Sequence, residues 1–129
     1  MPISYTIDST RQLVRTTATG ILTDRDVLTH KKVLAADPRF RPGMRELSDV
    51  RGVTDLRVTS AGVHAMVAAD AAHTVQSGAH QLAIVAGHDV VFGMARMYQT
   101  LTESTVSKVA VFRSQEDAIE WLGLDGLHG

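Results

Sequence analysis

The first part of the chain shows an alternating pattern of apolar and polar residues. Residues 3–8 alternate in this way, which is typical of a strand with one solvent-facing side. Residues 13–18 are rich in β-branched side chains and end close to Gly20. Because residues 8–11 form a short polar turn between the two runs, we expect an antiparallel hairpin at a sheet edge.

A helical pattern follows and predicts a helix from Asp24 to Ala36. Thr23 offers a hydroxyl group that can cap this helix, and the first turn is acidic. Proline displaces the preceding residue from helical geometry, so the helix should end at Asp37, before Pro38. The residues that recur at helical spacing are Val27, Leu28, Lys31, Leu34 and Ala35.

The middle of the chain predicts a short central strand and a second helix. The strand covers residues 44–50, and a polar loop follows it. The helix is predicted over residues 60–75, with a stop at Ser77-Gly78. This prediction is based on one apolar stripe, formed by Val63, Met66, Val67 and Ala71.

The last third of the chain predicts two strands and two helices. Residues 81–86 form a nearly continuous apolar run, typical of a strand covered on both faces, and we place this strand in the middle of the sheet. Asp89 can cap a third helix. The apolar face of that helix comprises Val91, Met94, Ala95, Tyr98 and Leu101.

Another strand is predicted over residues 107–112. A short last helix should begin after Ser114, run through Leu122 and end at Gly123. Trp121 is expected to anchor this helix to the sheet, with one edge of the ring at the surface.

Together these elements predict an α/β fold with the order β-β-α-β-α-β-α-β-α. Right-handed crossovers would make the strands parallel except for one, giving a mixed five-stranded sheet with one antiparallel edge strand. The chain has 129 residues, of which 44% are hydrophobic, and this suits one domain. We assign residues 1–123 to that domain and expect residues 124–129 to form a short tail that frays.

Composition and charge narrow the classes of function. The formal net charge of −1, with mixed signs throughout, indicates no surface for nucleic acid or an anionic membrane. The absence of cysteine excludes a disulfide framework, a thiolate metal site and a cysteine nucleophile, and it fits a cytoplasmic location. No run approaches the roughly 20 apolar residues of a membrane span, and the N-terminus lacks an export signal. We expect no nucleic-acid partner, no membrane insertion and no cofactor.

Several segments resemble those of the bacterial STAS and SpoIIAA-like proteins: DPRFRPG, LSDVRGVT, AIVAG, FGMARMYQ and VFRSQEDAIEWLG. The resemblance covers residues 3–122 and is closest to small stand-alone members without an assigned activity. It implies the β-α superhelical fold of domains related to anti-sigma-factor antagonists and to the cytoplasmic domains of sulphate transporters. It also implies a regulatory module whose protein partner is an anti-sigma-type kinase or another regulator.

The same resemblance singles out Ser60. In signalling members, the helix after the third strand opens with Asp-Ser-Ser-Gly, and its first serine accepts a phosphate from a partner kinase. Thr59, Ser60, Ala61 and Gly62 hold the matching positions, so Ser60 is the phosphoacceptor candidate. Thr59 replaces the acid, Ala61 replaces the second serine, and the loop after Asp49 is longer than in the family. The alternative is that Ser60 or Thr59 only caps the helix.

Open parallel sheets bind ligands beyond the carboxyl ends of their strands. The residues expected at this end form the predicted ligand or partner face: Asp49, Arg51, Thr59, Ser60, His88, Asp89 and Arg113. Our preferred hypothesis is a non-enzymatic module that binds a protein partner or a small ligand there.

The alternative is a small enzyme or ligand carrier that uses a cleft near Asp49, Ser60 and His88. These three side chains could be drawn as a nucleophilic triad, but triads are recognised by geometry. The chain lacks a Gly-x-Ser-x-Gly elbow and the glycine-rich phosphate loops, so we assign no catalytic residue. A deep pocket with a buried acid would favour the alternative, and a shallow face with an apolar rim would favour the module.

The six histidines are not expected to bind a metal ion. His64 and His73 lie nine residues apart, which places them on opposite faces of the predicted helix. The others are expected at separate places: His30 on an exposed charged face with Lys31 and Lys32, His80 and His88 near opposite ends of one strand, and His128 in the tail.

Three methionines are interpreted as core residues, because methionine fills irregular gaps: Met66, Met94 and Met97. The alternative for Met94 and Met97 is an apolar patch around Arg96 that serves a homodimer or another partner.

Overall fold

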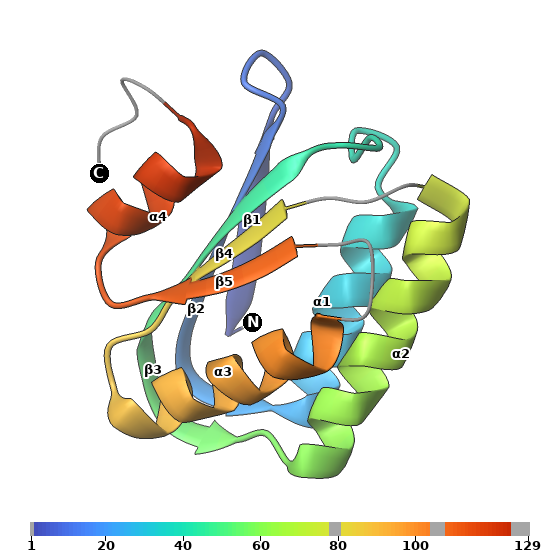
Figure 1. The fold of residues 1–129 in the computed structure, drawn as a ribbon. Helices are drawn as coiled ribbons and strands as arrows, with labels where there is room; N and C mark the ends of the chain where they lie inside the picture. Colours follow the sequence, from blue (N-terminus) through green and yellow to red (C-terminus); the bar gives the residue numbers. More distant parts are fainter. Residues whose placement is uncertain (1, 78–80, 104–107, 125–129) are drawn as a thin grey trace.

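A five-stranded sheet lies between three helices on one face and a single helix on the other (Figure 1). In this computed structural model, residues 2–77, 81–103 and 108–124 are described, without the side chains of residues 73–77. The strands are β1 (Ile3–Asp8), β2 (Leu13–Thr23), β3 (Arg45–Arg57), β4 (Gln81–Val85) and β5 (Lys108–Phe112). The helices are α1 (Asp24–Ala36), α2 (Ser60–Ser77), α3 (Asp89–Thr102) and α4 (Gln115–Leu122).

The order of elements and the strand directions confirm the predicted fold. The strands follow the order β1-β2-β3-β4-β5, with β1 antiparallel to β2 and the other pairs parallel. One prediction of position is wrong: β3, and not β4, is the middle strand. Each new strand is added beside the previous one along the chain, so the third of five is central. Two predicted boundaries, Gly78 after α2 and Ser107 before β5, lie outside the described residues.

β3 is nearly twice as long as the sequence predicts. The predicted strand covers residues 44–50, whereas β3 continues to Arg57, so the expected loop after Asp49 is the second half of the strand. β2 is longer than predicted for the same reason, because it pairs with β3 as far as Thr23. The pairing of the two strands overrides the weak strand propensity of their second halves.

The long β2–β3 pair is irregular near its middle. Its register shifts twice, between Thr17 and Thr19 and between Gly20 and Ile21. Such bulges bend and twist a strand pair. Gly52 lies at this point, and a Cβ atom there would come within 2.8 Å of the Thr19 Cγ2 atom. Glycine therefore allows the close approach of the two strands.

α1 begins and ends where the sequence predicts. The Thr23 side chain accepts a hydrogen bond from the Asp26 N–H, and the Asp26 carboxylate accepts one from the Thr23 N–H. This capping box satisfies two amide groups that the helix cannot pair. At the other end, Asp37 has an extended backbone (ψ 120°), as expected before Pro38.

The beginning of α3 differs from the prediction, whereas the beginning of α4 confirms it. Asp89 is the first residue of α3 and does not cap it; His88 holds the cap position and makes no side-chain cap hydrogen bond. Ser114 caps α4 by accepting a hydrogen bond from the Asp117 N–H. No helix in the described part of the chain is long and apolar enough to cross a membrane.

Leu124, which follows Gly123 at the end of α4, is held against the helix, which the sequence does not predict. Gly123 has a left-handed backbone (φ 71°), and its N–H and that of Leu124 bond to carbonyl groups in the last turn. A turn of this kind brings the next apolar residue back against the helix. Leu124 is buried, so the expectation that residues 124–129 fray is wrong for Leu124. Residues 125–129 lie outside the described part of the chain.

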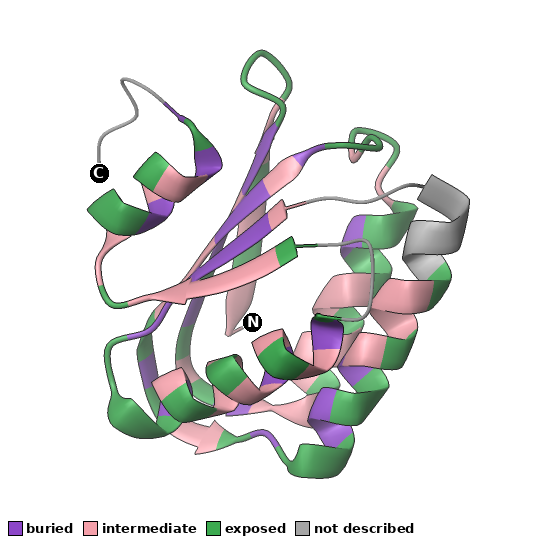
Figure 2. Cartoon of the chain, viewed as in Figure 1, coloured by how far each residue is buried: buried purple, intermediate pink, exposed green. Residues whose placement is uncertain are grey.

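The interior of the molecule is divided by the sheet. In β4, Leu82 and Ile84 pack in the cluster beneath α1, α2 and α3, whereas Ala83 and Val85 pack in the cluster beneath α4. Figure 2 shows the buried residues concentrated along the inner strands and on the sheet-facing sides of the helices. The prediction that β4 is covered on both faces is confirmed.

The single tryptophan and the three methionines occupy the expected kind of environment. The rings of Trp121 and Phe112 pack with their centroids 5.9 Å apart, so α4 is anchored to β5 as predicted. Met66 is buried in the core. Met94 and Met97 are half-buried and pack against the same core, so they do not form an exposed patch.

Candidate functional site

Five of the seven residues predicted at the ligand face lie around the ends of β4 and β5. Arg51 donates hydrogen bonds to both carboxylate oxygens of Asp49, at 2.9 and 2.8 Å. Arg113 donates to the Gly87 carbonyl at 2.8 Å and to Asp89 at 2.9 Å. These residues and His88 are on or near the surface, so this group is a shallow, charged face rather than a pocket.

The ion pair of Asp49 and Arg51 changes the acidity of its members. The hydrogen bonds from the Arg51 guanidinium hold the pKa of Asp49 below its ordinary value, and the carboxylate raises the pKa of Arg51. Asp49 is therefore an ionised, paired carboxylate and is not poised to take up a proton near neutral pH.

Thr59 and Ser60 belong to a different place in the molecule. β3 continues for eight residues beyond Asp49, and Thr59 follows its end. At about 3.3 Å per residue, this part of the strand is about 25 Å long. In the described part of the chain, no hydrogen bond joins Ser60, His88 and Asp49. The expectation that all seven residues gather at one place is therefore corrected, and the triad drawn from the sequence does not form.

The N-terminus of α2 is held by an acid from another helix. The N–H and the hydroxyl of Thr59 donate to the Asp24 carboxylate at 2.8 and 2.6 Å, and the Thr59 oxygen accepts from the Gly62 N–H at 3.0 Å. Thr59 is thus the cap, as one alternative predicted, and Asp24 supplies the negative charge that a helix N-terminus favours. Ser60 is exposed beside it, and its role as phosphoacceptor stays a prediction.

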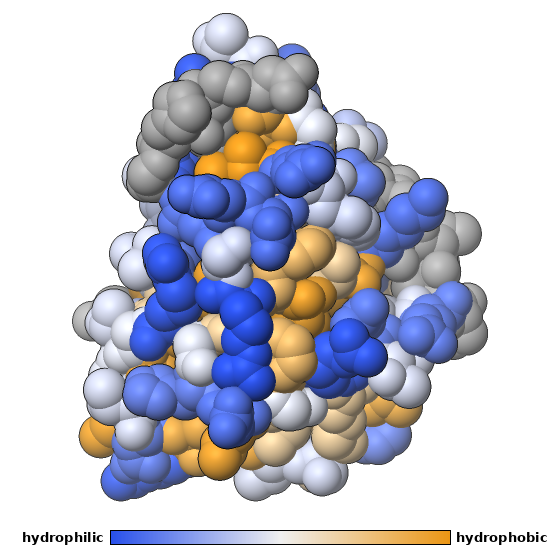
Figure 3. Space-filling view, turned by 60° about the vertical axis from the view of Figure 1, so that its left-hand side comes forward, coloured by the Kyte–Doolittle hydropathy of each residue, from blue (hydrophilic) through white to orange (hydrophobic). Residues whose placement is uncertain are grey.

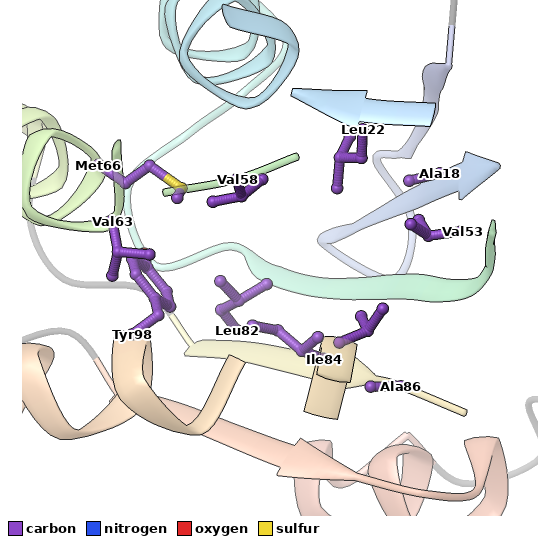
Figure 4. Packing of buried hydrophobic residues seen from close by; sticks show 11 residues of the cluster. Ala18, Leu22, Val53, Val58, Val63, Met66, Leu82, Ile84, Ala86 and Tyr98 are labelled. Atoms are coloured by element: carbon purple, nitrogen blue, oxygen red, sulfur yellow. The ribbon is translucent and has the colours of Figure 1, made fainter. Parts of the chain in front are cut away.

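A pocket lies between the sheet and the three helices α1, α2 and α3. Its volume is about 230 Å³. Side chains from both layers point into this region (Figure 4), among them Leu82 and Ile84 from β4, Val63 and Met66 from α2, and Tyr98 from α3. Val91 of α3 also lines the pocket. The sequence does not predict it, because its walls come from strands and helices that are far apart in the chain.

A buried acid lies on one wall of this pocket. The Thr16 hydroxyl donates to the Glu46 carboxylate at 2.7 Å, and the His30 Nε2 atom lies 3.3 Å from the same oxygen. The Tyr5 ring packs edge-on against His30, with centroids 5.6 Å apart. Glu46 is only 6% exposed. Burial of a carboxylate requires such partners, because an isolated buried charge is very costly.

A second polar group joins all three helices at the pocket wall. The Lys31 ammonium of α1 donates to the two carboxylate oxygens of Asp70 at 2.9 and 3.1 Å and to the Tyr98 hydroxyl at 3.2 Å. The Tyr98 hydroxyl of α3 donates to the Asp70 carboxylate of α2. The side chains of Lys31 and Asp70 are mostly buried.

The prediction that His30 and Lys31 lie on an exposed face is wrong. Both side chains face the pocket. The physical reason is the helical period: Val27, His30, Lys31 and Leu34 follow the spacing i, i+3, i+4 and i+7, which defines one face of a helix. This spacing was the available signal, and the polarity of the two side chains concealed it. Lys32 is exposed at the pocket rim.

The described residues contain no group of three or more histidine, aspartate or glutamate side chains that could hold a metal ion. His64 is exposed on α2. The side chain of His73, and the whole of His80 and His128, lie outside what the structure describes.

Comparisons with known proteins give a fold but no activity. No protein-family model and no curated protein matches the chain. Among solved structures, the chain is similar to an uncharacterised protein of the DUF3478 family with a SpoIIAA-like fold from Shewanella loihica PV-4. The TM-score is 0.57, the sequences are 18% identical, and the match covers 93% of each chain. At this identity the likeness concerns structure alone, and no catalytic family is indicated. The chain therefore has a SpoIIAA-like fold, as the resemblance in its sequence implies.

Proposed function

We propose that this protein binds a small, mostly apolar molecule in the pocket between the sheet and α1, α2 and α3. The observation that carries the proposal is the cavity of about 230 Å³, lined mainly by apolar side chains with a few buried polar groups. Small-molecule sites have this composition, and close-packed interiors rarely leave so large a space. At about 30 Å³ for each water-sized group, the pocket has room for about eight non-hydrogen atoms.

The proposal is one of binding and not of catalysis. Glu46 shares hydrogen bonds with Thr16 and His30, and Lys31 is bonded to Asp70 and Tyr98. These contacts fix the polar groups as parts of the pocket wall. The small ligand of our sequence-based hypothesis is kept, but its site moves from the strand ends to the space between the sheet and the helices.

Two neighbouring alanines of α2 provide a matched test. Ala69 lines the pocket, whereas Ala68 is exposed beside it. Titration calorimetry with 1-octanol should detect binding to the wild-type chain and to Ala68→Phe. Ala69→Phe places a ring in the pocket and should weaken binding by about tenfold or more. The proposal fails if the wild-type chain does not bind 1-octanol, or if both variants bind it equally well.

A second candidate is the predicted partner face at the ends of β4 and β5. Val90 is 70% exposed there, next to the ion pair of Asp89 and Arg113. On the side of the molecule that carries α4 and the beginning of α3, hydrophobic residues form areas bordered by hydrophilic residues (Figure 3). Apolar surface with a polar rim favours a protein partner, including a second copy of this chain.

Self-association at this face can be tested with one substitution. Sedimentation velocity of the wild-type chain should show a concentration-dependent dimer, and Val90→Glu should weaken it. Ala68→Glu, on the exposed side of α2, is the control for an added charge. A wild-type chain that stays monomeric at high concentration would contradict the homodimer and leave a different protein as the partner of this face.

A further inference from the structure

We infer that Ser48 binds the polar group of the ligand, so that the pocket takes an apolar molecule with one hydroxyl or carbonyl oxygen. This inference rests on the proposed function and adds the chemical class of the ligand. It follows from the position of Ser48 in the sheet, from its exposure and from the hydrogen bonds of the polar side chains around it.

Ser48 lies at the centre of the sheet. β3 is the middle strand, and Ser48 is in register with Thr16 of β2 on one side and with Ile84 of β4 on the other. Alternate residues of a strand face opposite sides, and Leu47 packs in the cluster beneath α4. The Ser48 side chain therefore points toward the layer of three helices, where it lines the pocket.

The side chain at this central position is only half-buried. Its flanking neighbours Thr16 and Ile84 are 3% and 9% exposed, whereas more of the surface of Ser48 is accessible. Because strands flank Ser48 on both sides and helices cover this face of the sheet, its accessible surface borders the pocket. A ligand that fills the pocket therefore contacts this side chain.

The hydroxyl of Ser48 is available to such a ligand. A serine hydroxyl can donate one hydrogen bond and accept two. Among the residues that the structure describes, none forms a hydrogen bond with the Ser48 side chain. Covering this hydroxyl with hydrocarbon alone is unfavourable, because the group loses its contact with water and gains no partner.

The other polar side chains of the pocket wall contact one another or lie at the rim. Lys32 is exposed at the rim. Below it, Ser48 is the polar side chain of the described wall whose hydrogen-bonding capacity is left whole for a ligand. The remaining ones form two groups, Thr16, His30 and Glu46 in one and Lys31, Asp70 and Tyr98 in the other.

The surroundings of Ser48 limit the ligand to a mostly apolar body. Along β3, the next residues that line the pocket are Val50 and Leu56, and β4 adds Leu82 and Ile84. A ligand gains free energy from burying hydrocarbon against these side chains and from pairing one oxygen with Ser48. A hydroxyl oxygen and a carbonyl oxygen can both accept the hydrogen bond that Ser48 donates.

Benzyl alcohol and ethylbenzene provide a matched pair of probes. They share a ring and have the same number of non-hydrogen atoms, but one carries a hydroxyl where the other carries a methyl group. Titration calorimetry compares the wild-type chain with Ser48→Ala, which removes only the hydroxyl oxygen. The variant should bind benzyl alcohol and 1-octanol about fivefold more weakly, as expected for the loss of one hydrogen bond.

Ethylbenzene should bind to Ser48→Ala at least as tightly as to the wild type, because it no longer covers an unpaired hydroxyl. Acetophenone, which accepts hydrogen bonds but does not donate them, tests the carbonyl class. A loss confined to the two alcohols assigns the ligand to the alcohols, and a loss confined to acetophenone assigns it to the carbonyl compounds.

Ser4→Ala is the matched control, because Ser4 is an exposed serine of β1 and the same atom is removed. It should bind every probe as the wild type does. If Ser48→Ala changes the affinity for ethylbenzene and for the oxygen-bearing probes by the same factor, Ser48 acts only through the shape of the pocket, and the inference is overturned.

The outcomes separate the inference from the proposed function. If the wild-type chain binds none of the probes, the proposed function fails and the inference fails with it. If 1-octanol binds equally well to the wild type and to Ser48→Ala, and acetophenone does so too, the proposed function stands and the inference is overturned.

Should Ser48→Ala not fold, as judged by circular dichroism, the wild-type chain decides the question. A pocket without a partner for the hydroxyl would bind benzyl alcohol more weakly than ethylbenzene, by as much as the two differ in transfer from water to an alkane. A smaller difference supports the inference, and a difference of that full size overturns it.

Discussion

Asp49 and Arg51 form an ion pair at the surface of the protein, and its contribution to stability should depend on pH. The hydrogen bonds from Arg51 lower the pKa of Asp49 in the folded state. Unfolding returns that pKa to about 3.9. The pair therefore stabilises the fold above about pH 4, and its contribution is lost as the pH falls through the lowered pKa.

Asp49→Asn tests this contribution. The pair is partly exposed, so the substitution should lower the free energy of unfolding at pH 7 by about 0.5 kcal/mol. The difference between the variant and the wild type should shrink steadily below about pH 4. Urea unfolding from pH 7 to about pH 3 measures it. A difference that stays constant over this range would show that the carboxylate charge is not its cause.

Two helical glycines should respond in opposite ways to the same substitution. A Cβ atom on Gly62 would collide with the Asp24 carboxylate, which is bonded to Thr59. A Cβ atom on Gly93 in α3 would meet nothing within 4 Å. Gly93→Ala should therefore stabilise the protein by about 0.5–1 kcal/mol, because alanine is the better helix former.

Gly62→Ala should instead destabilise the protein by about 1–3 kcal/mol, because the carboxylate must move away from the helix terminus. Thermal and urea unfolding of the two variants provide the comparison. If Gly62→Ala is as stable as Gly93→Ala, Asp24 does not hold the beginning of α2.

At the level of the helices, hydrogen bonds of Lys31, Asp70 and Tyr98 connect α1, α2 and α3. Asp70→Leu leaves the Lys31 ammonium without its carboxylate in a mostly buried position. Removal of one partner of such a pair costs about 3 kcal/mol. The double variant Lys31→Met with Asp70→Leu replaces both charges with apolar groups and should recover most of this loss.

The measurement is a double-mutant cycle of urea unfolding that also includes Lys31→Met. A double variant as unstable as the sum of its two single variants would show that the two charges do not interact. The cycle thus tests the contact that joins the three helices at the pocket wall.

For the molecule as a whole, binding in the pocket should be coupled to folding. The pocket exists only when the sheet and the three helices are packed together. A ligand at ten times its dissociation constant should therefore raise the free energy of unfolding by about 1.4 kcal/mol. Urea unfolding of the wild-type chain with and without 1-octanol measures this shift. Ala68→Phe should show the same shift, whereas Ala69→Phe, with its at least tenfold weaker binding, should show no more than about 0.4 kcal/mol; equal shifts in both variants would place the ligand elsewhere.

Much of the fold follows from local patterns that can be seen in the sequence. The hydroxyl of Thr23 marks the beginning of α1, and Asp37, the residue before Pro38, marks its end. Ser114 and Gly123 mark the two ends of α4. These signals are reliable because a cap satisfies backbone groups of its own helix. The second half of β3 has no such signal, since it is a strand only because β2 lies beside it.

The candidate site depends on contacts between distant parts of the chain. Thr16, His30 and Glu46 meet on one wall of the pocket, and Lys31, Asp70 and Tyr98 meet on another. Each polar side chain, considered alone, suggests an exposed position. Its burial becomes favourable only when a partner from another element satisfies its hydrogen bonds.

Local sequence patterns were therefore sufficient for the order of elements, the ends of α1 and α4, and the covered strand β4. These patterns depend on interactions between residues within about one turn of a helix or within one strand, so they do not depend on the rest of the fold. The length of β3, the inward positions of His30 and Lys31, and the pocket itself arise from packing between layers. Space between a sheet and three helices is a property of the assembled chain, so the site could be recognised only after these elements were in place.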